Sequence, residues 1–198
     1  TCIRHLQTEA GNLSQTGPVA TFMTADEVAP SWPLVSNLVV GEVTGSSVAL
    51  AWTPAVDDVA VAGYQVSAGE GLTVSVGAGV LEVVVTGLLS GATYPISVEA
   101  LDGAGNLSAG GPTATVATPD VEAPVWPDGS AMEALELQPT TVSFSWVEAN
   151  DNVGVVAYQV YRDGELVHTG EPESLEYKDW GLEPDTAYDY AVEAVDAA

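Results

Sequence analysis

The pentapeptide VSFSW, residues 142–146, alternates large apolar with small side chains, and a close counterpart, VALAW, occupies residues 48–52. This alternation is typical of a β-strand that buries one of its two faces. Each pentapeptide ends in a tryptophan, and Trp52 and Trp146 are 94 residues apart. The spacing predicts that one β-rich unit occurs twice.

The same shift of 94 residues aligns further positions without an insertion. It pairs Trp32 with Trp126, Tyr64 with Tyr158, Tyr94 with Tyr188, and AGNLS at residues 10–14 with AGNLS at residues 104–108. A period of this length is too long for a solenoid repeat and suits a small β-sandwich domain. We therefore expect an all-β chain with sandwich modules at residues 26–119 and 120–198.

The repeat also predicts what lies at the two ends of the sequence. In the first complete module, residues 104–119 supply the turn between strands F and G and the final strand G. By the same register, residues 1–25 are expected to be the terminal strands (the end of F, and G) of a preceding module, and the module at residues 120–198 is expected to lack its strand G. An open sandwich edge leaves backbone groups unpaired, so we expect neighbouring modules or further copies of the chain to associate end to end.

The chain is strongly acidic, with a formal net charge of −25 from 28 carboxylates against three Lys and Arg residues. Such a charge repels a phosphate backbone, which excludes nucleic acid as a partner. No apolar run reaches the roughly 18 residues that span a bilayer, which argues against membrane insertion. Salt or divalent cations would screen the carboxylates, and we therefore expect an extracellular or cell-surface location.

The residues that usually carry catalysis are scarce. The two histidines, His5 and His168, have no Ser, Cys or His partner at the spacing of a catalytic triad or a zinc site, and the glycines form no phosphate-binding loop. The single cysteine, Cys2, excludes an intrachain disulfide. We expect a chain without catalytic activity and without a required cofactor.

Several stretches in the expected order resemble the fibronectin type III family, especially its bacterial extracellular members. These stretches are APVWP, VSFSW, DNVGVVAYQVYRDGELV, GLEPDTAYDYAVEAVDAA and AGNLS. The resemblance implies tandem seven-stranded, immunoglobulin-like sandwiches, in which Tyr94 and Tyr188 would form tyrosine corners. The first copy departs from the pattern, because SAGE at residues 67–70 replaces the YRDG turn.

Acidic residues recur where such a sandwich gathers its entry linker, its B–C loop and its F–G loop at one end. In the first module they are Asp26, Glu27, Asp57, Asp58 and Asp102, and in the second they are Asp120, Glu122, Asp151, Asn152 and Asp196. Carboxylate and amide oxygens suit Ca²⁺, so we expect a calcium site at each of these ends. The competing interpretation is that the same side chains only close turns through their own backbone.

The sequence also contains two kinds of candidate sugar site, one for covalent attachment and one for binding. Each NLS triplet is an N-glycosylation sequon, at Asn12 and Asn106. Exposed aromatic rings bind glycans by stacking, and the candidates are Trp32, Trp126 and Trp180. Each of the three also has an ordinary interpretation as packing against a linker or a corner.

The leading functional hypothesis is a non-catalytic structural or adhesive segment of an extracellular surface protein or filament. The proline-bearing linkers DEVAPSWP and PDVEAPVWP favour a semi-rigid rod of repeats. The alternative is a pair of spacer modules in a secreted polysaccharide-degrading enzyme, since the resembling modules commonly stand beside a catalytic domain there.

Overall fold

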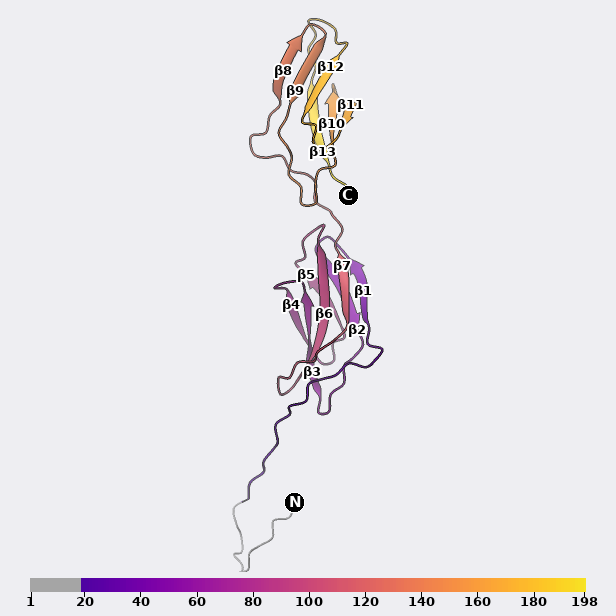
Figure 1. The fold of residues 1–198 in the computed structure, drawn as a ribbon, viewed down its shortest axis with the longest axis vertical. Helices are drawn as coiled ribbons and strands as arrows, with labels where there is room; N and C mark the ends of the chain where they lie inside the picture. Colours follow the sequence, from indigo (N-terminus) through magenta and orange to yellow (C-terminus); the bar gives the residue numbers. More distant parts are fainter. Residues whose placement is uncertain (1–18) are drawn as a thin grey trace, which may run out of the picture.

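The computed structural model describes residues 19–198, which form two β-sandwiches that follow one another along the long axis of the molecule (Figure 1). All thirteen strands pair antiparallel, which confirms the all-β fold. Within residues 19–198, no helix has the length and apolar content needed to cross a membrane.

The first module has the seven strands expected of the family, in two sheets. The three-stranded sheet has the order β1-β2-β5 and the four-stranded sheet the order β4-β3-β6-β7. The strands are β1 (Leu38–Val43), β2 (Ser47–Trp52), β3 (Val61–Ala68), β4 (Thr73–Gly77), β5 (Glu82–Thr86), β6 (Thr93–Asp102) and β7 (Thr113–Ala117). β7 pairs with β6 and is strand G of this module.

The second module repeats this arrangement with six strands. Its sheets have the orders β12-β9-β8 and β11-β10-β13. The strands are β8 (Glu133–Gln138), β9 (Thr141–Ser145), β10 (Ala157–Arg162), β11 (Glu165–Gly170), β12 (Glu176–Trp180) and β13 (Tyr190–Val195). Within the described residues, β13 therefore has β10 as a neighbour on one side and no strand on the other.

The alternating pentapeptides lie where the sequence predicts, with their large side chains between the sheets. Val48, Leu50 and Trp52 are buried, and the ring of Trp52 meets Tyr64 edge to face at 5.5 Å. Phe144 and Trp146 are buried in the second module, where Trp146 meets Tyr158 at 5.7 Å in the same way. The edge-to-face geometry of each aromatic pair stabilises the core in addition to the burial of the two rings.

A tyrosine corner is present in both modules, as the resemblance implies. The hydroxyl of Tyr94 accepts the backbone N–H of Leu89 at 2.7 Å, and the hydroxyl of Tyr188 accepts that of Glu183 at 3.0 Å. In each case the bond joins residues that are five positions apart. It fixes the loop that leads into β6 in the first module and into β13 in the second.

The hairpin turns of the two modules differ, as the change from YRDG to SAGE suggests. In the second module Asp163 and Gly164 both have positive φ, 51° and 83°, which is the two-residue turn that Asp-Gly favours. In the first module the loop between β3 and β4 is longer and places Gly69 at φ 66° and Gly71 at φ 87°. Two glycines thus replace the tight Asp-Gly turn.

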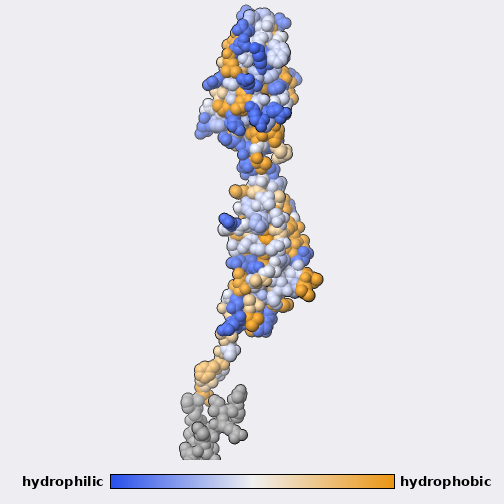
Figure 2. Space-filling view, in the orientation of Figure 1, coloured by the Kyte–Doolittle hydropathy of each residue, from blue (hydrophilic) through white to orange (hydrophobic). Residues whose placement is uncertain are grey.

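The module boundaries stay a prediction. Residues 19–25 form no strand and are exposed, and the remainder of the segment 1–25 lies outside the described residues. The surfaces of the modules differ more than their cores, because 18 of the carboxylates lie in residues 120–198 and nine in residues 26–119. On the face shown in Figure 2, strongly hydrophilic residues accordingly cover more of the second sandwich.

Candidate cation sites at the module ends

A short antiparallel bridge fixes each entry linker beside the B–C loop of its own module. In the second module the bridge joins Val125 and Asn150, whose backbones exchange N–H···O bonds of 2.7 and 2.8 Å. Ser31 and Val56 form the same bridge in the first module, at 2.8 and 2.9 Å. Asp151 follows Asn150 and Asp57 follows Val56, so each of these two aspartates is held beside the linker of its own module.

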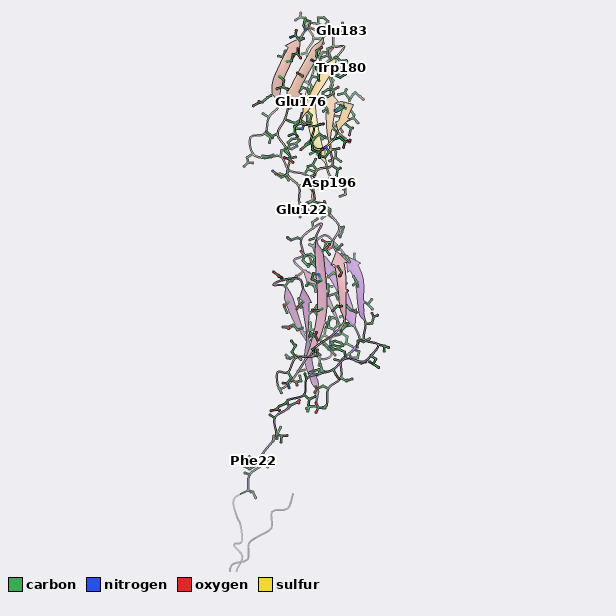
Figure 3. The ribbon with its side chains drawn as sticks, viewed as in Figure 1. Phe22, Glu122, Glu176, Trp180, Glu183 and Asp196 are labelled. Carbon is green, nitrogen blue, oxygen red and sulfur yellow. The ribbon has the colours of Figure 1, made fainter. Side chains whose placement is uncertain are left out.

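The junction cluster, which we define as Asp120, Asp151 and Asp196, lies at the end of the second module that faces the first. Each of the three offers a carboxylate oxygen within 4.8 Å of an oxygen of the other two. They come from the linker, the loop between β9 and β10, and the residue after β13. Figure 3 shows Asp196 near the junction between the two sandwiches.

One oxygen of Asp120 is used to fix the orientation of its carboxylate. Its Oδ1 accepts hydrogen bonds from Ser90 Oγ and from Asn152 Nδ2, both at 3.1 Å, and from the N–H of Glu122 at 3.2 Å. The bond from Asn152, followed by those from Glu122 and Ser90, holds the pKa of Asp120 below its usual range despite partial burial. Asp120 is therefore ionised at any ordinary pH.

Asp151 and Asp196 are oriented by the backbone of their own loops. Asp151 Oδ1 accepts the N–H groups of Val153 at 2.9 Å and Gly154 at 2.7 Å. Asp196 Oδ1 accepts the N–H of Ala198 at 3.0 Å. These bonds are the turn closures of the competing interpretation, but they engage only one oxygen of each carboxylate.

The second oxygens of two junction carboxylates are buried without a partner. Oδ2 of Asp120 and Oδ2 of Asp151 are shielded from solvent and accept no hydrogen bond. A buried carboxylate oxygen without a donor carries the full cost of its lost hydration. Turn closure through Oδ1 does not explain these two atoms.

The N-terminal cluster, which we define as Asp26, Asp57 and Asp58, repeats this geometry in the first module. The three carboxylates offer oxygens within 4.8 Å of one another. Oδ1 of Asp57 accepts the N–H groups of Val59 and Ala60, at 3.0 and 2.8 Å, while its Oδ2 is buried without a partner. The same division between a bonded and an unbonded oxygen thus occurs in both modules.

Asp102 does not belong to the N-terminal cluster, although the repeat aligns it with Asp196. Its Oδ1 accepts the N–H groups of Ala104, Gly105 and Asn106, and its Oδ2 accepts the side-chain amide of Asn106 at 2.7 Å. Burial raises the pKa of Asp102, but these bonds outweigh it and leave the pKa below the usual range. Both oxygens close the F–G turn, and Asp58 takes the third position of the cluster.

The other predicted ligands lie around the clusters. Glu27 and Glu122 are exposed and are not members of either cluster. Asn152 instead bridges the two modules, because its side-chain amide donates to the backbone oxygen of Ser90 at 3.1 Å as well as to Asp120. No feature of the sequence points to Ser90, since the repeat aligns it with Pro184 in the second module.

No positive side chain neutralises either cluster within the described residues. The ion pairs there are Arg162–Asp179, at 2.8 Å, and Lys178–Glu136, at 2.6 Å, both within the second module. Each cluster thus concentrates three carboxylates without a counter-charge from residues 19–198. Carboxylates alone, without His or Cys, form a ligand set for a hard cation such as Ca²⁺ rather than for zinc.

The predicted sugar-contacting residues differ in accessibility. Asn12 lies outside the described residues, and the side-chain nitrogen of Asn106 donates to Asp102 and to the backbone oxygen of Asp26. Trp32 and Trp126 pack against Tyr64 and Tyr158, each at 5.9 Å.

Trp180, by contrast, is 69% exposed on β12 (Figure 3). It is the remaining candidate for a glycan-stacking ring. Of the two histidines, His168 stacks on Tyr177 at 4.9 Å, and His5 lies outside the described residues.

Residues 30–116 match the family model described as "Fibronectin type III domain". These residues, which form the first module, therefore belong to the fibronectin type III family, and the second module has the corresponding strand order and repeats the same core positions. The fibronectin type III domain is a non-catalytic module.

Similar regions occur in bacterial enzymes that are much longer than this chain. Chitinase A1 of Niallia circulans is 37% identical over 183 residues, covering 90% of this chain and 25% of the chitinase. Exoglucanase B of Cellulomonas fimi is 36% identical over 183 residues, covering 88% and 16% of the respective chains. Endoglucanase B of Cellulomonas fimi is 34% identical over 200 residues, covering 96% and 19%. The chain thus spans a quarter or less of the length of these relatives.

Proposed function

We propose that this chain is a pair of non-catalytic spacer modules in a secreted, extracellular polysaccharide-degrading enzyme. The observation that carries the proposal is the match to Chitinase A1, which covers 90% of this chain but 25% of that protein. Matches of similar extent to an exoglucanase and an endoglucanase support the same context. The comparisons therefore favour this function over a structural or adhesive filament.

Direct contacts between the modules support the spacer role. A Cβ atom added to Gly91 of the first module would collide with a methyl group of Val153, and one added to Gly45 would lie 2.5 Å from a methyl group of Val121. Together with the bond from Asn152 to Ser90, these contacts leave little room at the junction. A tight junction favours a semi-rigid arm over a flexible tether.

The length of the strands sets the scale of this arm. β6 has ten residues, and a strand rises about 3.3 Å per residue, so one module extends over about 33 Å. Two modules placed end to end, as in Figure 1, would separate their flanking segments by roughly 70 Å. Such a separation would let a catalytic domain reach substrate at a distance from an anchoring domain.

The test is to isolate the full native polypeptide and compare it with a form that lacks residues 26–198. We expect the full polypeptide to carry a glycoside hydrolase domain. The deletion should leave hydrolysis of soluble oligosaccharides unchanged and reduce hydrolysis of insoluble polysaccharide, where reach matters. A Gly/Ser linker of equal residue number in place of the modules serves as the matched control for stiffness.

A full polypeptide without a hydrolase domain that assembles into filaments under the electron microscope would overturn the proposal. Equal activity of all three forms on insoluble substrate would also overturn it, because the modules would then not act as a spacer. Binding to further copies of the chain stays a separate prediction, which the same micrographs test.

A further inference from the structure

We propose that the junction cluster of Asp120, Asp151 and Asp196 binds one Ca²⁺ ion, and that the N-terminal cluster of Asp26, Asp57 and Asp58 binds a second. The proposal does not depend on the enzyme context, because it rests on the geometry of the described residues alone. Its failure would leave the spacer function intact.

The first argument is the buried, unbonded oxygen found in both clusters. Oδ2 of Asp120, Asp151 and Asp57 is shielded from solvent and accepts no hydrogen bond. A cation bound to these oxygens would supply the interaction that the protein does not. The buried oxygens distinguish these clusters from an ordinary acidic patch, in which the carboxylates remain hydrated.

The second argument is the distance between the carboxylates. In each cluster every carboxylate offers one oxygen that lies within 4.8 Å of an oxygen of the other two, which is about twice the Ca²⁺–oxygen distance of roughly 2.4 Å. One ion can therefore contact all three oxygens, with water or backbone oxygens completing its six to eight ligands. Mg²⁺ is a poorer match, because it needs a shorter and stricter octahedral geometry and retains its water.

The third argument is that the carboxylates are already positioned. Oδ1 of Asp57 and Oδ1 of Asp151 each accept two backbone N–H groups, and Asp120 is held by Ser90 and Asn152. Little side-chain freedom remains to be lost when an ion binds, which favours binding. The turn closures engage Oδ1 of Asp57 and Asp151 and leave their Oδ2 atoms without a hydrogen bond.

The junction ion would act on the geometry between the modules. It would join the linker, the loop between β9 and β10, and the end of β13 through Asp120, Asp151 and Asp196. Asp120 also accepts the hydroxyl of Ser90, which belongs to the first module. We infer that Ca²⁺ binding at this site stiffens the joint between the two modules.

The experiment is calorimetric titration of the full 198-residue chain with CaCl₂ after removal of bound metal by a chelator. We expect saturable binding of two ions, with dissociation constants of about 10⁻⁴ to 10⁻³ M as in other extracellular modules. Asp151→Asn should lose the junction ion and Asp57→Asn the other. Both substitutions keep an amide oxygen that accepts the turn N–H bonds, so folding should be preserved.

The matched control is Asp128→Asn, which removes one charge from an exposed position outside both clusters. It should bind two ions like the wild type. Differential scanning calorimetry should show a Ca²⁺-dependent rise in melting temperature for the wild type and Asp128→Asn, and a smaller rise for either cluster variant.

Three results would overturn the proposal. The first is the absence of saturable heat up to a Ca²⁺ concentration of about ten times the weaker expected dissociation constant. The second is binding of two ions, as in the wild type, by Asp151→Asn and also by Asp57→Asn. The third is an equal response to Mg²⁺, which would indicate only charge screening.

Discussion

The side-chain amide of Asn152 in the second module donates a hydrogen bond to the backbone oxygen of Ser90 in the first, at 3.1 Å, and a second one to Asp120 at the same distance. Asn152 lies in the B–C loop of the second sandwich. Its side chain therefore links this loop to the E–F loop of the first sandwich, through Ser90, and to the linker, through Asp120. These bonds stand beside the contacts of Val153 with Gly91 and of Val121 with Gly45 at the same junction.

Replacing Asn152 with alanine should loosen this joint and raise the pKa of Asp120 toward its ordinary value. The physical reason is that the bond from Asn152 is the largest contribution lowering that pKa. An NMR titration that follows the Asp120 carboxyl carbon measures the shift. Asn150→Ala is the control, since Asn150 contributes its backbone to the bridge with Val125. An unchanged pKa in Asn152→Ala would contradict the assigned contact.

A side chain at Gly91 should force the modules apart. Gly91 has φ 63°, and an added Cβ would collide with Val153, so Gly91→Ala combines backbone strain with a clash between the modules. Small-angle X-ray scattering should show a broader range of module orientations than in the wild type. Gly79→Ala is the control, because its Cβ would enter open space without a positive φ. Identical scattering from both variants would mean that the contact is not made in solution.

When the pH is changed from neutral, the joint should weaken on the acid side. Because the pKa of Asp120 is lowered in the folded protein, its carboxylate stabilises the fold fully above its ordinary value of 3.8. This stabilisation is lost as the pH falls through the lowered pKa. Scattering profiles should therefore be constant from pH 7 to about pH 5 and change below about pH 4. A change already complete at pH 5 would show that another group controls the joint.

The second module should lose stability in alkali. Burial, together with the hydrogen bond that its hydroxyl donates to Asp179 at 2.8 Å, raises the pKa of Tyr190 above the ordinary 10.0. The neutral phenol is therefore favoured by folding, so its contribution is fully present below pH 10 and is lost as the pH rises through the raised pKa.

Circular dichroism against pH, combined with the phenolate absorbance, measures this loss. Tyr190→Phe cannot ionise and lacks the bond to Asp179 at every pH, so its stability should depend less on pH above pH 10 than that of the wild type, whereas Tyr161→Phe, which keeps the bond from Tyr190 to Asp179, should stay closer to the wild type. A pH dependence as steep in Tyr190→Phe as in the wild type would disagree with the direction of this pKa shift.

The spacer function predicts that the chain has no strong affinity of its own for polysaccharide. Trp180 offers one exposed ring, and one ring gives little stacking area. Wild type and Trp180→Ala should therefore remain equally in the supernatant after incubation with insoluble chitin or cellulose. Retention of the wild type but not of Trp180→Ala would instead assign a glycan-binding role to β12.

The core positions were predictable from the sequence because they depend on local alternation and on a repeat of fixed length, which place Trp52 and Trp146. The corners of Tyr94 and Tyr188 were implied by the resemblance to the fibronectin type III family, and the structure puts all four residues where they were expected. Strand register determines which face of the sheet these side chains occupy, since a shift by one residue would turn them to the other face.

The composition of the cation clusters was only partly predictable, because it depends on loop conformation. The repeat aligns Asp102 with Asp196, yet Asn106 engages Asp102 in the F–G turn, and Asp58 lies in the cluster instead. The junction contact of Ser90 has no counterpart in the repeat, so a comparison of the two copies could not reveal it. A residue that contacts a neighbouring module need not recur at the equivalent position of the other module.

The central claim is that the two modules form one stiff arm whose joint is fixed by the contacts around Asp120 and by Ca²⁺ at the junction cluster. Electron–electron double resonance measures this stiffness most directly, with spin labels at the exposed positions Ser75 and Glu165, one in each module. Cys2→Ser removes the native thiol. In Ca²⁺ we predict a single narrow distance distribution, which broadens with a chelator and in Asp151→Asn. A broad distribution that is the same with Ca²⁺, with chelator and in Asp151→Asn would contradict the account.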